Sequence, residues 1–243
     1  HINNGLQMAQ FHSENLAATG AYFEGWKLYD KVIKNNYMRH REMISVLKEW
    51  RQESAPETLK VLELGCGDAW VATEVFSTHH DLEYHGMDLS APAMEIGQSR
   101  AAALEWNSHW TKAAFPEGLA HLNGPFDVIL SGFALHHLRA NELDTTLREC
   151  QRLLKPGGSL VIYDELRKPF ESREAYLNRF LTSVNQDWLA LDKEQNKATH
   201  EHIRNCDFPI SLEQWHTTAR LNGFGSPVSL YRDEEELFCL LTF

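Results

Sequence analysis

Two glycines at the end of a short apolar run are the first residues that suggest a chemical task. The run LKVLEL (59–64) lacks helical spacing and is followed at once by Gly65-Cys66-Gly67. This pattern predicts a buried parallel strand that turns into a helix. A glycine turn lets a ligand approach the backbone, and the start of the next helix offers unpaired N–H groups to an anionic group. The segment is therefore a candidate ligand-binding loop.

A dinucleotide is one ligand that such a loop could hold. Dinucleotide sites prefer the spacing G-x-G-x-x-G, in which the third glycine eases packing of helix against strand. Here Trp70 stands at that third position, and the acidic Asp68 would lie unfavourably close to a pyrophosphate. A nicotinamide-dependent oxidoreductase is therefore the weaker alternative.

Residues that could accept a proton follow two later apolar runs. His136 and His137 come after FDVIL, and Asp164 and Glu165 come directly after SLVIY. Open α/β sheets bind ligands beyond the carboxyl ends of their strands, so these side chains map to one edge. We expect His136 to face a bound acceptor while His137 points into the packing. Side chains alternate between the two faces of a strand, so only one of the two carboxylates can face the pocket. We name Asp164 as the catalytic candidate. A structural ion pair between Asp164 and Arg167 is an equal alternative.

A third histidine lies further along, in a polar segment with helical spacing. His200 and His202 precede Cys206, a spacing that could suggest a metal site. No second group of ligands in the sequence supports it, so no metal is expected. His202 is predicted instead to face the substrate from a helical cap and is a third catalytic candidate.

Four motifs in order resemble the class I S-adenosylmethionine-dependent methyltransferase superfamily. ELGCGDA (63–69) matches its first motif, with Ala69 for the usual glycine, and Asp88 in HGMDLS matches the acidic residue that holds both ribose hydroxyls. FDVILSGFALHHL and LLKPGGSLVIYDE match its fourth- and fifth-strand motifs, so the resemblance spans about Val61 to Glu165. An acidic residue often found near the adenine is replaced by Lys112-Ala113-Ala114. The resemblance implies that S-adenosyl-L-methionine is held by Glu63, Gly65, Cys66, Gly67, Asp88 and Leu89.

A narrower resemblance concerns the segment before the first strand. WKLYDKVIKNNYMRH is similar to the lid of a subgroup that includes carboxy-S-adenosylmethionine synthase. That similarity implies that Tyr37 faces the cofactor and that Ser131, after the fourth strand, is a polar cofactor contact. YDELRKPFESREAYL and HIRNCDFP resemble bacterial small-molecule methyltransferases of unassigned substrate.

The elements that must position these residues alternate between strand and helix. We predict an α/β, Rossmann-like, doubly wound and mostly parallel seven-stranded sheet with an antiparallel C-terminal hairpin. The other predicted strands are 82–87, 109–112, 126–130, 159–163, 226–231 and 236–243, and the predicted helices are 36–50, 90–106, 141–154 and 211–223. Pro156-Gly157-Gly158 is expected to end the third of these helices. The predicted domains are a helical lid (1–55) and a cofactor-binding domain (56–243) with a helical cap at about 168–208.

Aromatic residues precede the first predicted helix and leave two interpretations open. Tyr22, Phe23, Trp26 and Tyr29 either pack that helix onto the body of the protein or form a lid over a ligand.

The composition narrows the partners. The chain has 243 residues with 23 basic and 34 acidic side chains, a net charge of −11 that should repel polyanions. No apolar stretch is long enough for a membrane span, and four scattered cysteines fit a reducing cytoplasm.

The predicted function is therefore transfer of a methyl group from S-adenosyl-L-methionine to oxygen, nitrogen or carbon of a small molecule. A carboxy-S-adenosylmethionine synthase-like or tRNA-modifying enzyme is the alternative, and a non-catalytic cofactor-binding protein is a third possibility. Neither nucleic acid nor membrane is expected as a partner.

Overall fold

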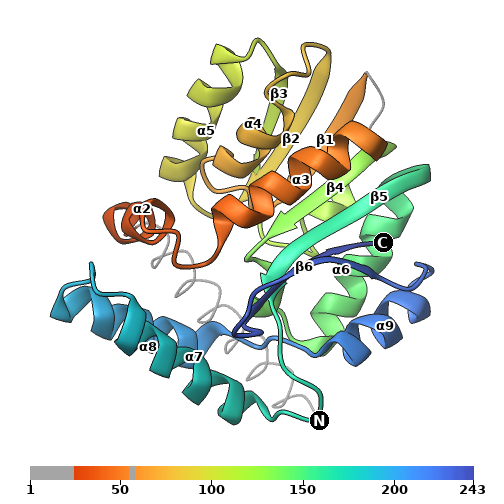
Figure 1. Cartoon of the computed structure of the whole chain (residues 1–243). Coiled ribbons are helices and arrows are strands. Elements are labelled where there is room, and N and C mark those ends of the chain that lie inside the picture. Colours follow the sequence, from red (N-terminus) through yellow and green to blue (C-terminus); the bar gives the residue numbers. More distant parts are fainter. Residues whose placement is uncertain (1–24, 55–57) are drawn as a thin grey trace, which may run out of the picture.

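A single sheet in the order β3-β2-β1-β4-β5-β7-β6 forms the centre of the protein (Figure 1). The computed structural model describes residues 25–54 and 58–243. The strands are β1 (Leu59–Leu64), β2 (Leu82–Asp88), β3 (Asn107–Lys112), β4 (Phe126–Gly132), β5 (Leu154–Glu165), β6 (Val228–Arg232) and β7 (Phe238–Thr242). Strands β1 to β5 pair in parallel, and β7 pairs antiparallel with both β5 and β6. The predicted doubly wound sheet with its closing hairpin is confirmed.

The central strands are apolar on both faces because helices cover both sides. Along β4, Val128 and Leu130 join one hydrophobic cluster, while Phe126 and Ile129 join the cluster on the opposite face. Helices α3 (His40–Ser54), α4 (Trp70–Phe76) and α5 (Ala91–Ala103) lie on the first side, and α6 (Ala140–Leu153) and α9 (Leu212–Leu221) on the second (Figure 1). This double coverage explains the nearly continuous apolar runs in the sequence.

Most predicted boundaries differ from the observed ones by a few residues, with two larger differences. Helix α3 begins at His40 rather than 36, because Asn36 and Arg39 both adopt left-handed backbone angles. Strand β5 begins at Leu154, so Pro156-Gly157-Gly158 lies inside the strand rather than in a turn before it. The pairing of β5 with β4 shifts register between Phe126 and Val128 of β4, and this irregularity accommodates the extra residues of β5.

The helices outside these layers gather at the carboxyl ends of β4 and β5. They are α2 (Trp26–Lys34), α7 (Arg173–Asp187) and α8 (Lys193–Cys206), with the short 3-10 turn η2 (Leu135–His137). A second 3-10 turn, η1 (Leu119–His121), precedes β4 and contacts the end of α6 through Arg152. Figure 1 shows α2 between the sheet and the pair α7 and α8. No helix in the described part of the chain has the length and apolar character needed to span a bilayer. Of the aromatic residues before α3, Tyr22 and Phe23 lie outside the described residues.

Candidate functional site

The glycine loop after β1 is built for close backbone approach. Gly65 and Gly67 have φ angles of +66° and +49°, a region that side chains rarely adopt. A Cβ at Gly65 would lie 2.5 Å from the Cβ of Ala134, so the loop packs directly against the segment after β4. A Cβ at Gly67 would have no described atom within 4 Å, so the loop presents its backbone to open space. This is the arrangement that a ligand needs in order to lie against the loop.

Asp88, at the end of β2, faces the glycine loop. Its Oδ2 accepts a hydrogen bond from the N–H of Gly67 at 2.8 Å, and Oδ1 accepts one from the N–H of Ser90 at 2.8 Å. Burial raises the pKa of the Asp88 carboxyl, and these backbone donors oppose that shift. The carboxylate is thus fixed in place, and each oxygen retains acceptor capacity for a ribose hydroxyl.

Three other predicted cofactor residues support the loop from inside. Glu63 is 2% exposed and accepts a hydrogen bond from the hydroxyl of Tyr84. Burial raises the pKa of Glu63 to about 8. Ser131, fully buried, donates to the carbonyl of Leu64 at 3.3 Å and so ties β4 to β1. Cys66 is buried as well, and its N–H donates to the carbonyl of Met87 at 3.1 Å, while Leu89 is half-buried.

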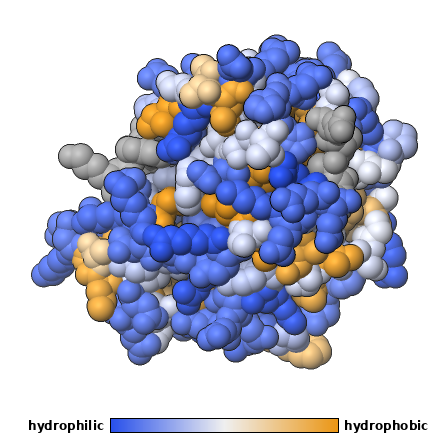
Figure 2. Space-filling model, turned by 45° about the horizontal axis from the view of Figure 1, so that its top comes forward, coloured by the Kyte–Doolittle hydropathy of each residue, from blue (hydrophilic) through white to orange (hydrophobic). Residues whose placement is uncertain are grey.

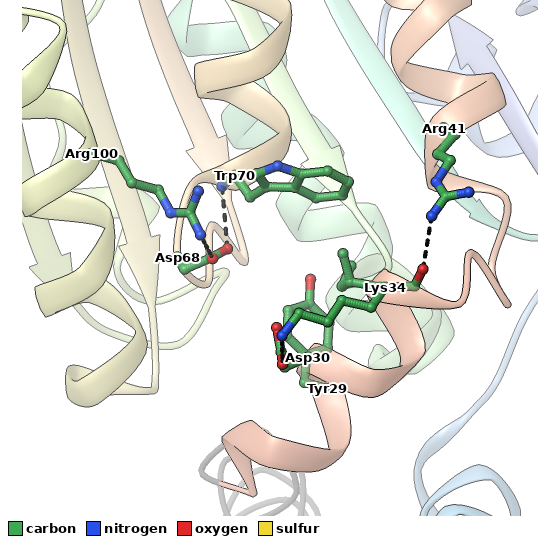
Figure 3. Close-up of a pocket in the computed structure, with 8 residues that line it drawn as sticks. Tyr29, Asp30, Lys34, Arg41, Asp68, Trp70 and Arg100 are labelled. Carbon is green, nitrogen blue, oxygen red and sulfur yellow. Dashed lines mark hydrogen bonds and ion pairs between the residues drawn. The ribbon is translucent and has the colours of Figure 1, made fainter. Parts of the chain in front are cut away.

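The residues after the glycine loop border a cleft of about 330 Å³ (Figure 3). Ala69 has a φ of +54°, in the left-handed region that glycine adopts most easily. This angle explains why related sequences usually have glycine at this position. Asp68 is paired with Arg100 at 2.8 Å on one side of the cleft, and on the other Arg41 donates to the carbonyl of Lys34 (Figure 3). Trp70 projects between the two sides (Figure 3).

A second cavity, of about 40 Å³, lies between α2, the ends of β4 and β5, and the helices α7 and α8. Its walls combine apolar rings with titratable groups. The lining residues are Tyr29, Val32, Met38, Phe133, His136, His137, Glu165, Phe180, Trp188, Thr199, His202, Ile203 and Asp207. The structure therefore brings the predicted His136 and His202 together, although 65 residues separate them.

Asp164 lies behind His136 rather than in the wall of the cavity. Its carboxylate accepts hydrogen bonds from Nδ1 of His136 and, at 3.1 Å, from the backbone N–H of His136. Of these two neighbouring carboxylates on β5, Glu165 is the one that lines the cavity. The alternative ion pair between Asp164 and Arg167 does not form, because Arg167 donates to the side chain of Gln214 at 2.6 Å.

His137 and Asp207 are cavity residues that the sequence did not indicate. Both histidines of the pair line the cavity, so the expectation that His137 points into the packing is wrong. The two imidazoles lie on the 3-10 turn η2 with ring centroids 4.0 Å apart. Asp207 follows the end of α8, and its closeness to His202 in HIRNCDFP was the signal available in the sequence. His200 instead faces outward and pairs with Asn185 at 2.9 Å.

Electrostatics divide the cavity residues into charged and neutral groups. Burial lowers the pKa of His136, but Glu165, Asp164 and Asp207 together raise it well above its usual value. Burial lowers the pKa of His202 to about 3. Burial and the neighbouring Asp207 carboxylate raise the pKa of Glu165. His136 is therefore cationic and His202 neutral at physiological pH.

Tyr37 joins the lid to the cap. Its ring stacks on Trp188 with centroids 5.0 Å apart, and its hydroxyl accepts a hydrogen bond from the N–H of Ala190 at 2.8 Å. Lys31, on α2, donates to the carbonyl of Ala190 at 3.2 Å and to Gln195 at 2.7 Å. A contact between Tyr37 and the cofactor stays a prediction.

Comparisons with known proteins agree with this geometry. Residues 62–160 match the family model described as a methyltransferase domain. The chain is 28% identical over 200 residues to phosphoethanolamine N-methyltransferase of Plasmodium falciparum, covering 79% of this chain and 71% of that protein. It is 26% identical over 137 residues to YafE of Escherichia coli, covering 53% of this chain and 65% of YafE, so it spans less than two thirds of that relative.

A solved structure extends the likeness to the whole fold. Magnesium protoporphyrin IX methyltransferase from Synechocystis, solved with bound S-adenosylmethionine, superposes with a TM-score of 0.63 at 13% identity, covering 94% of this chain and 95% of that one. The sheet order and the helices on both of its faces are those of the Rossmann-like methyltransferase fold. Residues 62–160 thus match a methyltransferase domain, and the relatives and the shared fold support a class I S-adenosylmethionine-dependent methyltransferase.

Proposed function

We propose that this protein transfers the methyl group of S-adenosyl-L-methionine to a small-molecule acceptor bound in the cavity beneath α2. The observation that carries the proposal is the cavity lined by His136, His202 and Glu165. It lies beside the glycine loop, since Gly65 packs on Ala134, two residues before His136. Relatives that act on phosphoethanolamine and demethylmenaquinone support a small acceptor.

The cofactor is assigned to the glycine loop and Asp88. Gly65 and Gly67 allow close approach to the backbone, and the fixed Asp88 carboxylate would accept the two ribose hydroxyls. Glu63, Cys66 and Ser131 support this cradle from behind, and Leu89 borders it. When bound, the sulfonium supplies a methyl group that is already activated for transfer.

The chain's own residues must then orient the acceptor and exclude water. His136 and His202 would direct imidazole nitrogens at a polar group of the acceptor, and Asp164 acts as a positioning residue because it fixes the ring of His136. Burial opposes ionisation of Asp207, but the imidazoles of His136, His137 and His202 hold the pKa of its carboxyl well below the usual range, so Asp207 would act as the fixed anion of the cavity. The narrow cavity requires α2 to move from the cap when the acceptor enters, so the proposal includes a lid role for α2.

Replacing Asp88 tests the cofactor site. Asp88→Ala should weaken S-adenosylmethionine binding about 100-fold, because two charge-assisted hydrogen bonds are lost. Isothermal titration calorimetry measures the affinity, and circular dichroism checks the fold. Glu95→Ala, an exposed residue of the nearby α5, removes the same charge and should bind as the wild type does. Unchanged affinity in a folded Asp88→Ala protein would refute the assigned site.

A further inference from the structure

Three imidazoles in the cavity converge on one carboxylate oxygen. Oδ1 of Asp207 lies 3.5 Å from Nε2 of His136, 3.4 Å from Nδ1 of His137 and 3.7 Å from Nε2 of His202. These distances exceed those of good hydrogen bonds. Ligand atoms that each lie about 2.1 Å from one shared metal ion are separated by about 3 to 3.5 Å, which matches this spacing. Potential ligand atoms of His136, His137 and Asp207 all lie within 4.8 Å of one another.

An outer contact holds the ring of His136 in the orientation that a metal ligand needs. Asp164 accepts from Nδ1 of His136, so a metal ion would take the place of the proton on Nε2, the nitrogen that faces Asp207 and Glu165. Histidines that bind metals are typically fixed in this way by a carboxylate or a backbone carbonyl. Nδ1 of His137 faces both Asp207, at 3.4 Å, and the carbonyl of Cys206, at 3.1 Å, so a metal ion bound at Nδ1 would replace the contact with that carbonyl.

The backbone also clamps the two ligand-bearing segments together. The N–H of Phe208 donates to the carbonyl of His136 at 2.6 Å, so Asp207 is tied to η2. The ring of Phe208 lies between the guanidinium groups of Arg139 and Arg173, at 3.5 and 4.2 Å. These contacts place Asp207 before any ion binds, and preorganisation of this kind raises affinity.

The buried carboxylates require positive charge. Asp164, Glu165 and Asp207 are each at most 2% exposed and surround the single imidazole of His136. Among the described residues, no hydrogen-bond donor reaches Oδ1 of Asp207 or Oε2 of Glu165. Arg173 donates to the backbone carbonyl of Asp207 and not to its carboxylate. A buried carboxylate oxygen without a donor is costly, and a metal ion would satisfy it.

We propose that His136, His137 and Asp207 bind one divalent first-row transition metal ion, with Glu165 as a further oxygen donor. Imidazole with carboxylate favours zinc, iron(II) or cobalt over magnesium and calcium, which take oxygen ligands alone. The site replaces the expectation of no metal, which considered only His200, His202 and Cys206. Together with the proposed function, it implies an acceptor whose oxygen, nitrogen or sulfur atom binds the metal and becomes more acidic there.

A second group that could hold a metal ion serves as an internal control. Glu83, His85 and His109 lie together on β2 and β3, where they are partly exposed. Glu83 is already paired with Lys60 at 3.0 Å, which reduces its capacity to bind a cation. His109→Gln therefore removes a possible outer ligand without touching the cavity.

Cobalt(II) is the direct probe, because its visible absorption reports the number and type of its ligands. The full chain, dialysed against EDTA, should bind one equivalent of cobalt(II), which zinc(II) displaces, and its melting temperature should rise with the metal. Asp207→Asn and His137→Gln should each weaken cobalt binding at least about 100-fold, and His109→Gln should leave it unchanged. If Asp207→Asn fails to fold, His137→Gln decides the question.

Absence of stoichiometric cobalt binding, or equal loss in His109→Gln, would overturn the proposal and leave the cluster as a proton-holding network. Calorimetry with S-adenosylmethionine alone separates this outcome from failure of the proposed function. Metal binding without cofactor binding would reject the methyltransferase assignment and retain the metal site. Cofactor binding without metal binding would retain the methyltransferase assignment and reject the metal site.

Discussion

Single side chains set the electrostatics beneath the cofactor loop, and Glu63 is the clearest case. Its position in the first motif is one that the resemblance assigned to cofactor binding, yet its carboxyl group is buried against the hydroxyl of Tyr84. Burial, with the Asp68 and Asp88 carboxylates nearby, raises its pKa to about 8, while Tyr84 opposes the shift. Glu63 is therefore protonated at neutral pH and supports the loop as a neutral group.

Glu63 should make stability fall as pH rises. The unfolded chain releases this proton above its ordinary pKa of 4.5, whereas the folded protein keeps it up to about 8. Between about pH 5 and 8 the free energy of unfolding should decrease by about 1.4 kcal/mol per pH unit from this group, and Glu63→Gln should remove that slope. Urea unfolding across this range measures it, with the exposed Glu95→Gln as the control. Parallel pH profiles for the wild type and Glu63→Gln would contradict the assignment.

At the scale of elements, the ends of β4 and β5 shape one wall of the cavity beneath α2. Gly132 pairs with Tyr163 across these strands, and the tyrosine ring covers the glycine backbone. Phe133 follows with a left-handed φ of +47° and packs edge-on against Tyr163, with ring centroids 5.5 Å apart. Strained backbone of this kind is common beside functional sites.

Gly132→Ala should destabilise the protein by about 1 to 3 kcal/mol, because the new Cβ would lie 1.8 Å from the ring of Tyr163. Thermal or urea unfolding measures the loss. Gly225→Ala is the matched control, since a Cβ there meets no described atom within 4 Å. In a Tyr163→Ala background the effect of Gly132→Ala should shrink, because the clash is removed. An equal effect in both backgrounds would show that the ring is not the cause.

Over the whole molecule, acidity and surface character favour small acceptors over RNA. The net charge is −11, and many cations of the described surface are already paired, among them Lys34 with Asp30, Lys48 with Glu74 and Lys155 with Asp127. Figure 2 shows a largely hydrophilic face on which apolar residues form separate patches. The surface in this view therefore has no extended apolar area of the kind that marks a large protein interface.

We expect no saturable binding of tRNA at physiological ionic strength, because binding to a polyanion requires clustered cations. Fluorescence anisotropy with labelled tRNA measures this, alongside a basic tRNA-binding protein as a positive control. Salt-dependent, saturable binding would favour the tRNA-modifying alternative over the small-molecule one.

The sequence by itself determined the sheet and the position of the glycine loop and Asp88 at its strand ends, because both depend on local patterns. Apolar runs with turn residues between them define parallel strands, and the glycine loop and Asp88 each lie directly at a strand end.

Only the tertiary structure decided which residues line the cavity beneath α2. His136 and His137 lie on a turn after β4, whereas His202 and Asp207 lie at the end of the cap. No periodicity in the sequence specifies that these distant segments meet, since the packing of α7 and α8 on the sheet brings them together. The position of Asp164 behind His136 likewise depends on the tertiary structure. Alternation along β5 predicts that Asp164 and Glu165 point to opposite faces of the sheet, but it does not say which face the cavity occupies.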